Sequence, residues 1–242
     1  MNSLEYLVGE SERKPHSPQL LPWIWQWIVF VFPFLAGQAA GPRRPVRRPS
    51  RVSKSASLPP IPKLFGPRPR KLLVLDLDET LVHTMSHGYH RNCQIVEIHH
   101  EDSAMTTFQY VAKRPFCTDF LSTVDQWYEL AVFTASCREY ADPIIDLLEH
   151  DIGRPVFGRR YYRDSCTVSS DGYIKNLDLF GRELGHVVLV DNTPVSYAAQ
   201  QSNGLAIEGW ISDPSDRALL QLLPLLFALR HTTDVRSILS LR

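Results

Sequence analysis

The chain has 242 residues with 26 basic and 26 acidic side chains, so its formal net charge is zero; 44% of its residues are hydrophobic and 21% charged. This composition is too apolar for a wholly disordered chain and too polar for a protein with several membrane spans. Residues 38–71 contain ten lysines and arginines and no acid, whereas residues 72–242 carry a net charge of −9. A basic neck precedes an acidic body, and the body has the wrong sign to bind nucleic acid.

The four cysteines lie 20 or more residues apart and form no CxxC pair. This spacing argues against a zinc site or a disulfide scaffold and predicts reduced thiols in a domain that faces the cytosol. The cysteines are Cys93, Cys117, Cys137 and Cys166.

Residues 1–19 are short and polar and are predicted to be mobile. The next 18 residues, 20–37 (LLPWIWQWIVFVFPFLAG), contain no charge. As a helix they would measure about 27 Å, enough for a thin bilayer. They are predicted to be a membrane anchor, in preference to a signal peptide or a buried core helix. Pro33 would kink or end the helix, so both a full span and a hairpin that only dips into the bilayer stay open.

Residues 38–70 form a basic linker rich in proline and serine. Positive charge directly after an anchor predicts that the following chain stays on the cytoplasmic side. The linker is expected to be solvated and also able to touch anionic lipid.

From residue 71 the pattern predicts a globular α/β domain with a parallel sheet, because strands alternate with helices. The apolar stretch ALLQLLPLLFAL near the end is too short for a membrane span and is predicted to pack in the core. The elements expected in chain order are a buried strand in LLVLDLD, a hairpin at 94–99 and 107–113, a helix at 116–126, a strand at 128–134, a helix at 138–149, short strands within 159–175, a buried strand at 186–192, and helices at 215–230 and 234–240.

Polar residues follow three of the apolar strands: Asp76 and Asp78 after the first, Thr134 after the second and Asp191 after the last. In an open α/β sheet, ligands bind beyond the carboxyl ends of the strands, so these side chains are expected to converge. Neighbouring carboxylates repel one another unless a cation lies between them, and a cluster rich in oxygen ligands favours Mg²⁺.

A pair of carboxylates can also transfer a phosphoryl group by covalent catalysis. One aspartate attacks phosphorus while the other donates a proton to the leaving oxygen and then activates water. Lys175 in GYIKNL is the candidate cation for the phosphate, and Thr134 offers a hydroxyl donor. Each of these residues alone is weak evidence. Their order along the chain, with each on a separate predicted element, favours phosphoryl transfer.

The motif LLVLDLDETLVH resembles the first motif of haloacid-dehalogenase-type phosphatases. Further segments resemble the carboxy-terminal-domain phosphatase branch, and within it the Dullard-type nuclear-envelope phosphatases, over about residues 70–242. These segments are KRPF, WYELAVFTAS, REYADPIIDLLE, RRYYRDSC, GYIKNL, VDNTPVSYA, EGWISDPSD and LLPLLFALRHTTDVRSIL. The resemblance implies a Rossmann-like parallel sheet with a short hairpin insertion and no large cap domain.

The resemblance also implies a role for each matching residue. Asp76 is the expected nucleophile and Asp78 the general acid and base. Mg²⁺ is expected on Asp76, on the main-chain carbonyl of Asp78 and on Asp191. The residues expected to bind phosphate or substrate, or to support that binding, are Thr80, Thr134, Arg163, Lys175 and Asn192, although Arg163 could instead pair with an acid such as Asp164.

The resemblance implies Mg²⁺-dependent dephosphorylation of serine or threonine in proteins, because Asp78 can protonate an alkoxide leaving group. It further implies a nuclear-envelope or endoplasmic-reticulum membrane location with the catalytic domain, residues 71–242, facing cytoplasm or nucleoplasm. The implied substrate is a lipin-type phosphatidate phosphatase, and the implied partner is a small membrane regulatory subunit. A phosphatase for the RNA polymerase II tail and a non-catalytic membrane scaffold remain as alternatives.

Overall fold

The computed structural model describes residues 69–86, 93–100 and 105–241. The predicted mobile N-terminus, the anchor and all but the last two residues of the basic linker lie outside the described residues. Within the described part of the chain, no helix combines the length and apolar character needed to cross a bilayer.

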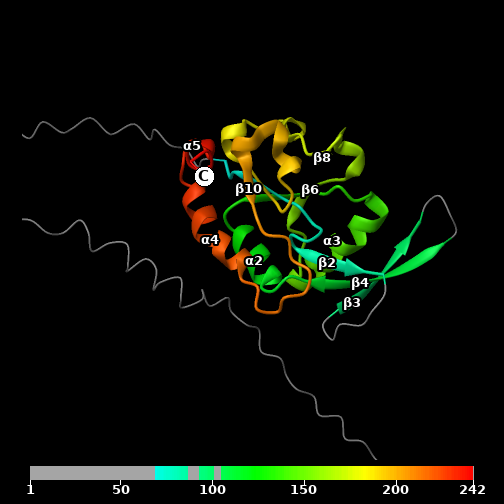
Figure 1. The fold of residues 1–242 in the computed structure, drawn as a ribbon. Coiled ribbons are helices and arrows are strands. Elements are labelled where there is room, and N and C mark those ends of the chain that lie inside the picture. The colour runs from blue at the N-terminus through cyan, green and yellow to red at the C-terminus, as the bar shows by residue number, and fades with distance from the viewer. Residues whose placement is uncertain (1–68, 87–92, 101–104, 242) are drawn as a thin grey trace, which may run out of the picture. The chain divides into compact units, whose positions relative to one another are not determined.

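A parallel sheet of five strands forms the centre of the domain, so the predicted α/β fold is confirmed (Figure 1). The strand order is β10-β9-β1-β5-β6, which places β1 in the middle between β9 and β5. The strands are β1 (Leu72–Leu75), β5 (Glu129–Phe133), β6 (Phe157–Tyr161), β9 (Val187–Asp191) and β10 (Gly204–Ala206).

The central strands form because their residues are apolar on both faces. All residues of β1 and β9 are buried, which is the pattern of a parallel sheet covered on both sides. Alternate residues such as Leu72 and Val74 pack on one face against Leu177 and Phe180 from the chain that follows β8. This packing fixes the register of the strands and therefore the place where each strand ends.

Helices α2 (Cys117–Val124), α3 (Arg138–Ile152) and α4 (Ala218–Leu229) bury leucine, isoleucine and valine side chains, and α2 contacts both of the others. Helix α4 was expected to begin at residue 215 but begins at Ala218. The preceding residues form turns instead, and the Asp216 carboxylate accepts from the Ala218 N–H at 3.1 Å. A short helix, α5 (Arg236–Leu239), ends the described chain.

A second, antiparallel sheet, in the order β2-β4-β3, is inserted between β1 and α2. Its strands are β2 (Val82–Met85), β3 (Cys93–His99) and β4 (Thr106–Lys113). The sequence predicted only the β3–β4 pair, because β2 is four residues long and directly follows the aspartate motif. In Figure 1 this small sheet extends from one side of the domain.

Short elements connect β6 to β9. The strands β7 (Thr167–Ser169) and β8 (Gly172–Ile174) form a hairpin within the predicted range 159–175, and Gly172, the first residue of β8, has a positive φ of 139°. Three 3₁₀ segments also lie between β6 and β9, namely Arg163–Ser165, Leu177–Phe180 and Leu184–His186, and a fourth, Pro194–Asn203, follows β9.

Candidate active site

Three adjacent parallel strands end in polar residues at the same edge of the sheet. Asp76 follows β1, Thr134 follows β5, and Asp191 is the last residue of β9. The Asp76 N–H donates to Val190 O at 3.0 Å, which keeps the chain beside β9 just beyond the last pair of the ladder. The structure therefore brings these side chains together at the carboxyl ends of the central strands.

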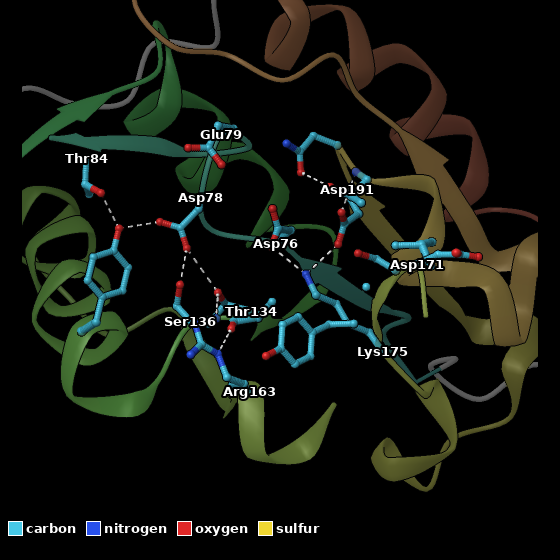
Figure 2. A pocket seen from close by; sticks show the side chains of 18 residues that line it. Asp76, Asp78, Glu79, Thr84, Thr134, Ser136, Arg163, Asp171, Lys175 and Asp191 are labelled. Atoms are coloured by element: carbon cyan, nitrogen blue, oxygen red, sulfur yellow. Dashed lines mark hydrogen bonds and ion pairs between the residues drawn. The ribbon is translucent and has the colours of Figure 1, made fainter. Parts of the chain in front are cut away.

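An open cleft of about 470 Å³ lies at this edge (Figure 2). Thr80 is the one sequence-predicted site residue that does not line the cleft; it is buried and bonded to Asp76. The predicted residues that line it are Asp76, Asp78, Thr134, Arg163, Lys175, Asp191 and Asn192.

Lys175 bridges two of the aspartates at the floor of the cleft. Its Nζ donates to Asp76 Oδ1 and to Asp191 Oδ2, each at 2.6 Å, and its side chain is 1% exposed. Burial would lower the pKa of Lys175, but the two facing carboxylates outweigh it and raise that pKa. Burial and the charge of Asp76 raise the pKa of Asp191 to about 6, against the attraction of Lys175. Two buried carboxylates, those of Asp76 and Asp191, thus share the single positive charge of Lys175.

The turn that follows Asp76 brings Thr80 back toward the Asp76 carboxylate. Glu79 adopts a left-handed conformation with φ of 57°, which is uncommon for a residue with a side chain. The turn allows Thr80 Oγ1 to donate to Asp76 Oδ2 at 2.8 Å. Both oxygens of Asp76 therefore have fixed partners, Lys175 on one and Thr80 on the other.

Arg114 supports this turn from beneath, and the sequence reasoning did not identify it as part of the site. Its side chain is fully buried and forms a bidentate pair with Asp216 at 2.9 and 2.8 Å. Its Nη1 also donates to Glu79 O and Thr80 O at 3.4 and 3.3 Å. The Trp210 N–H donates to Glu79 O at 2.8 Å, so two distant segments hold the left-handed turn in place.

Asp78 is surrounded by hydroxyl groups rather than by cations. Tyr140 OH donates to its Oδ1 at 2.6 Å, and Ser136 Oγ donates to its Oδ2 at 2.8 Å. Thr134 Oγ1 lies 3.4 Å from the same Oδ2. Burial is the main cause that raises the pKa of Asp78, and these hydroxyls only partly offset it. A carboxyl with a raised pKa is suited to donate a proton.

Arg163 and Asn192 lie at the wall of the cleft. Arg163 Nε donates to Ala135 O at 2.6 Å, and its guanidinium lies 5.6 Å from the Tyr173 ring centroid. Among the ion pairs of the described residues, none involves Arg163, so it does not pair with Asp164 there. Asn192 accepts from Thr193 Oγ1 at 3.3 Å, beside the Thr193 N–H bond to Asp191.

The donor set suits a hard divalent cation. Asp76 and Asp191 share a single lysine, Asp78 has only hydroxyl partners, and burial together with the charge of Asp76 raises the pKa of Asp191. Carboxylate and carbonyl oxygens are the ligands that Mg²⁺ prefers. Across residues 69–86, 93–100 and 105–241, no three acidic, histidine or cysteine side chains form a metal-binding group by themselves. A metal here would need the main-chain carbonyl of Asp78 as well as the side chains of Asp76 and Asp191.

Tyr140 and Ser136 were not predicted as site residues. Ser136 stands in the TAS segment at the end of β5, so its position after a strand was a usable signal. Tyr140 lies one helical turn further along, in α3, and its bond joins residues that are 62 positions apart in the sequence. No local pattern identifies such a contact.

The family model for NLI interacting factor-like phosphatases matches residues 71–236. This match covers more than half of the chain, and it includes every residue described above in the cleft. The chain therefore belongs to the NLI interacting factor-like phosphatase family. Together with the relatives described next, this match confirms the predicted resemblance to the carboxy-terminal-domain phosphatase branch and its Dullard-type nuclear-envelope members.

Individual relatives agree with this assignment. The chain is 46% identical over 184 residues to nuclear envelope morphology protein 1 of Schizosaccharomyces pombe, covering 76% of this chain and 38% of that protein. It is 44% identical over 179 residues to CTD nuclear envelope phosphatase 1B of Danio rerio, covering 71% of each. The fold is similar to that of Fcp1, an RNA polymerase II CTD phosphatase, with a TM-score of 0.50, 21% identity, and coverage of 71% of this chain and 52% of the other. The chain thus spans well under half of its fission yeast relative.

Proposed function

We propose that the protein is a Mg²⁺-dependent protein serine/threonine phosphatase in which Asp76 becomes transiently phosphorylated. The observation that carries the proposal is a pair of aspartates, two residues apart, held in different ways in one cleft. Asp76 is fixed by Lys175 and Thr80, whereas Asp78 is held by hydroxyls and has a raised pKa. Such a division suits one carboxylate for attack and the other for proton transfer.

In the first step a carboxylate oxygen of Asp76 attacks phosphorus, and the bond from phosphorus to the serine or threonine oxygen breaks. Asp78 gives its proton to that leaving oxygen. In the second step Asp78 takes a proton from water, whose oxygen attacks the phosphorus. The bond to Asp76 then breaks, phosphate leaves, and both aspartates return to their starting states.

Lys175 would hold the phosphate oxygens and keep Asp76 in line, since its ammonium is fixed between two carboxylates. Thr134 would donate its hydroxyl to another phosphate oxygen, and Arg163 would contact the phosphopeptide at the cleft wall. Mg²⁺, when bound to Asp76, Asp191 and the Asp78 carbonyl, would supply charge neutralisation for the phosphate.

A protein is the expected substrate because the cleft is open. The described residues between β1 and α2 build only the small sheet β2-β4-β3, with no large cap over the site. Metabolite enzymes commonly close a lid to exclude water, whereas an extended phosphopeptide needs access from the side.

For the whole protein, we propose residues 1–19 as a mobile N-terminus, 20–37 as a membrane anchor, 38–70 as a linker and 71–242 as the catalytic domain. The names of relatives refer to the nuclear envelope, which supports a location at the nuclear envelope or the contiguous endoplasmic reticulum. The resemblance further suggests a lipin-type phosphatidate phosphatase as substrate, hence a role in lipid metabolism, and a small membrane regulatory subunit as partner.

The test is phosphate release from phosphoserine peptides by the full-length protein in lipid nanodiscs, with Mg²⁺ or with EDTA. Turnover is expected only with Mg²⁺ and is expected to vanish in Asp76→Asn. Asp119→Asn, on the exposed face of α2, is the matched control and should behave as wild type. Full activity of Asp76→Asn would overturn the mechanism. Phosphoproteomes of cells that carry wild type or Asp76→Asn would then show whether lipin-type phosphosites accumulate.

A further inference from the structure

The wall of the cleft continues onto the hairpin of β7 and β8. Tyr173, in the middle of β8, lines the cleft, and so does Lys175 two residues further on. Side chains two residues apart in an extended chain point the same way, and an extended chain advances about 3.3 Å per residue. The tyrosine ring therefore borders the place where the phosphate is proposed to bind.

Val168 extends this wall with an apolar side chain just beyond the residues that line the cleft. It lies directly opposite Tyr173 in the antiparallel pair of β7 and β8, and side chains opposed in this way stand on the same face. Val168 is nevertheless 75% exposed. Tyr173 and Val168 together form an apolar surface beside the phosphate site, which we call the hairpin platform.

Contacts with the rest of the domain hold the hairpin platform in place. The guanidinium of Arg163 lies 5.6 Å from the centroid of the Tyr173 ring, and its Nε donates to Ala135 O at 2.6 Å. At the end of β8 the Lys175 N–H donates to Ser196 O at 2.8 Å. A surface that is already fixed loses little conformational entropy when a ligand binds to it.

The charges near the hairpin platform favour a neutral occupant. Asp171 and Arg163 both line the cleft (Figure 2), the first at the hairpin turn and the second against the Tyr173 ring. A charged side chain on the platform would be attracted by one of these groups and repelled by the other. An aliphatic side chain is indifferent to both and gains from the burial of apolar area.

We propose that the hairpin platform binds an aliphatic side chain of the phosphopeptide, within three positions of the phosphoserine, and that Val168 is a specificity-determining residue. The inference rests on the proposed function, because it assumes that a phosphopeptide occupies the cleft. It adds a preference among phosphopeptides, for those with an aliphatic residue near the phosphate over those with polar or acidic neighbours.

The test scans a phosphoserine peptide that has serine at the three positions on either side, with leucine replacing one serine at a time. The quantity measured is kcat/KM for phosphate release by the full-length protein in lipid nanodiscs with Mg²⁺. One position is expected to favour leucine over serine about tenfold, the effect of burying roughly half of a leucine side chain.

Two variants then assign the preference to Val168. In Val168→Ser the ratio of leucine to serine peptide at that position should fall to less than about threefold. In Val168→Lys the ratio of leucine to glutamate peptide should fall about tenfold, because an apolar contact is lost and an ion pair is gained. The matched control is Ile95→Ser, which removes a similarly exposed strand residue that does not line the cleft, and it should keep the wild-type ratios.

The absence of any position that prefers leucine, or a preference that both Val168 variants retain, would overturn the proposed role of the hairpin platform. A wild-type protein that releases phosphate from none of the peptides would instead refute the proposed function. The two failures are therefore distinguishable in one set of assays.

Discussion

Asp76 and Asp78 leave the same strand two residues apart, but they are held by opposite kinds of partner. Asp76 is fixed by the ammonium of Lys175 and by Thr80. Asp78 has no cation beside it among the described residues and accepts only from hydroxyl groups, chiefly those of Tyr140 and Ser136.

The proposed division of roles, with one aspartate as nucleophile and the other as proton donor, rests on this difference. A cation favours the ionised form of a neighbouring carboxylate, whereas burial among neutral donors favours the protonated form. The fold creates the contrast by bringing Lys175 in after β8 and Tyr140 in on α3. Three substitutions test this contrast directly, and a fourth tests the ion pair of Arg114, which supports the turn between the two aspartates and Thr80.

Lys175→Met should have the largest effect, because it leaves Asp76 and Asp191 buried without a counter-charge. In EDTA the free energy of unfolding is expected to fall by about 3–5 kcal/mol, measured by urea denaturation. Phosphate release should fall by at least about a hundredfold, since a lost charge contact at the reacting centre contributes several kcal/mol. Lys113→Met, which breaks the part-exposed pair with Asp151, is the control and should cost less than about 1 kcal/mol. Unchanged stability and turnover in Lys175→Met would contradict the role of Lys175 as the counter-charge of Asp76.

Asp216→Asn tests an ion pair outside the cleft and should have the second largest effect, about 2 kcal/mol of unfolding free energy, because Arg114 is fully buried. The hydrogen bonds and charge of Arg114 lower the pKa of Asp216. Its stabilisation should therefore be fully present above the unfolded-state pKa of about 3.9 and be lost as pH falls through the lower folded-state pKa. Urea denaturation of both proteins from neutral to acidic pH measures this. A difference between wild type and variant that grows on acidification would contradict it.

Thr80→Val removes the hydroxyl from Asp76 while keeping a similar shape in a fully buried position. We expect kcat/KM for phosphoserine peptide to fall about tenfold, because a hydrogen bond to a charged group contributes roughly 1.5 kcal/mol. The measurement is phosphate release under initial-rate conditions. Thr123→Val, whose hydroxyl bonds only the main chain of α2 near the surface, is the control.

Ser136→Ala should have the smallest effect, about threefold on the same kcat/KM, because each oxygen of Asp78 keeps a hydroxyl neighbour and a single neutral hydrogen bond contributes about 1 kcal/mol or less. Tyr140 remains on Oδ1 and Thr134 remains near Oδ2. If Ser136→Ala lowered kcat/KM more than Thr80→Val does, the hydroxyl on Asp78 would matter more than the one on Asp76, contrary to expectation.

Much of the fold was predictable because its central strands carry strong local signals. LLVL and VVLVD are continuous apolar runs that end in acids, and they became β1 and β9. The strands β2 and β10 have four and three residues, too few for a period to be recognised, and their pairing depends on distant neighbours. The strand ends converge because β1 lies between β9 and β5 in the sheet, and Lys175 bonds the aspartates at two of these ends.

The site was predictable only in part. Position at the end of an apolar strand made three site residues predictable, namely Asp76, Thr134 and Asp191. Their catalytic and metal-binding roles stay predictions. Arg114 bonds a residue 102 positions away, so its support of the Glu79 turn could not be predicted from local sequence. Contacts of this kind appear only once the chain has folded.

In the proposed mechanism, Asp76 carries the phosphoryl group during turnover. The most direct measurement is intact-protein mass spectrometry after rapid acid quench of the full-length protein with phosphoserine peptide and Mg²⁺. We expect a species heavier by one phosphoryl group. Hydroxylamine should remove this group, which should map to Asp76 and be absent in Asp76→Asn. Steady turnover by Asp76→Asn, or a phosphoryl group on another residue, would contradict it.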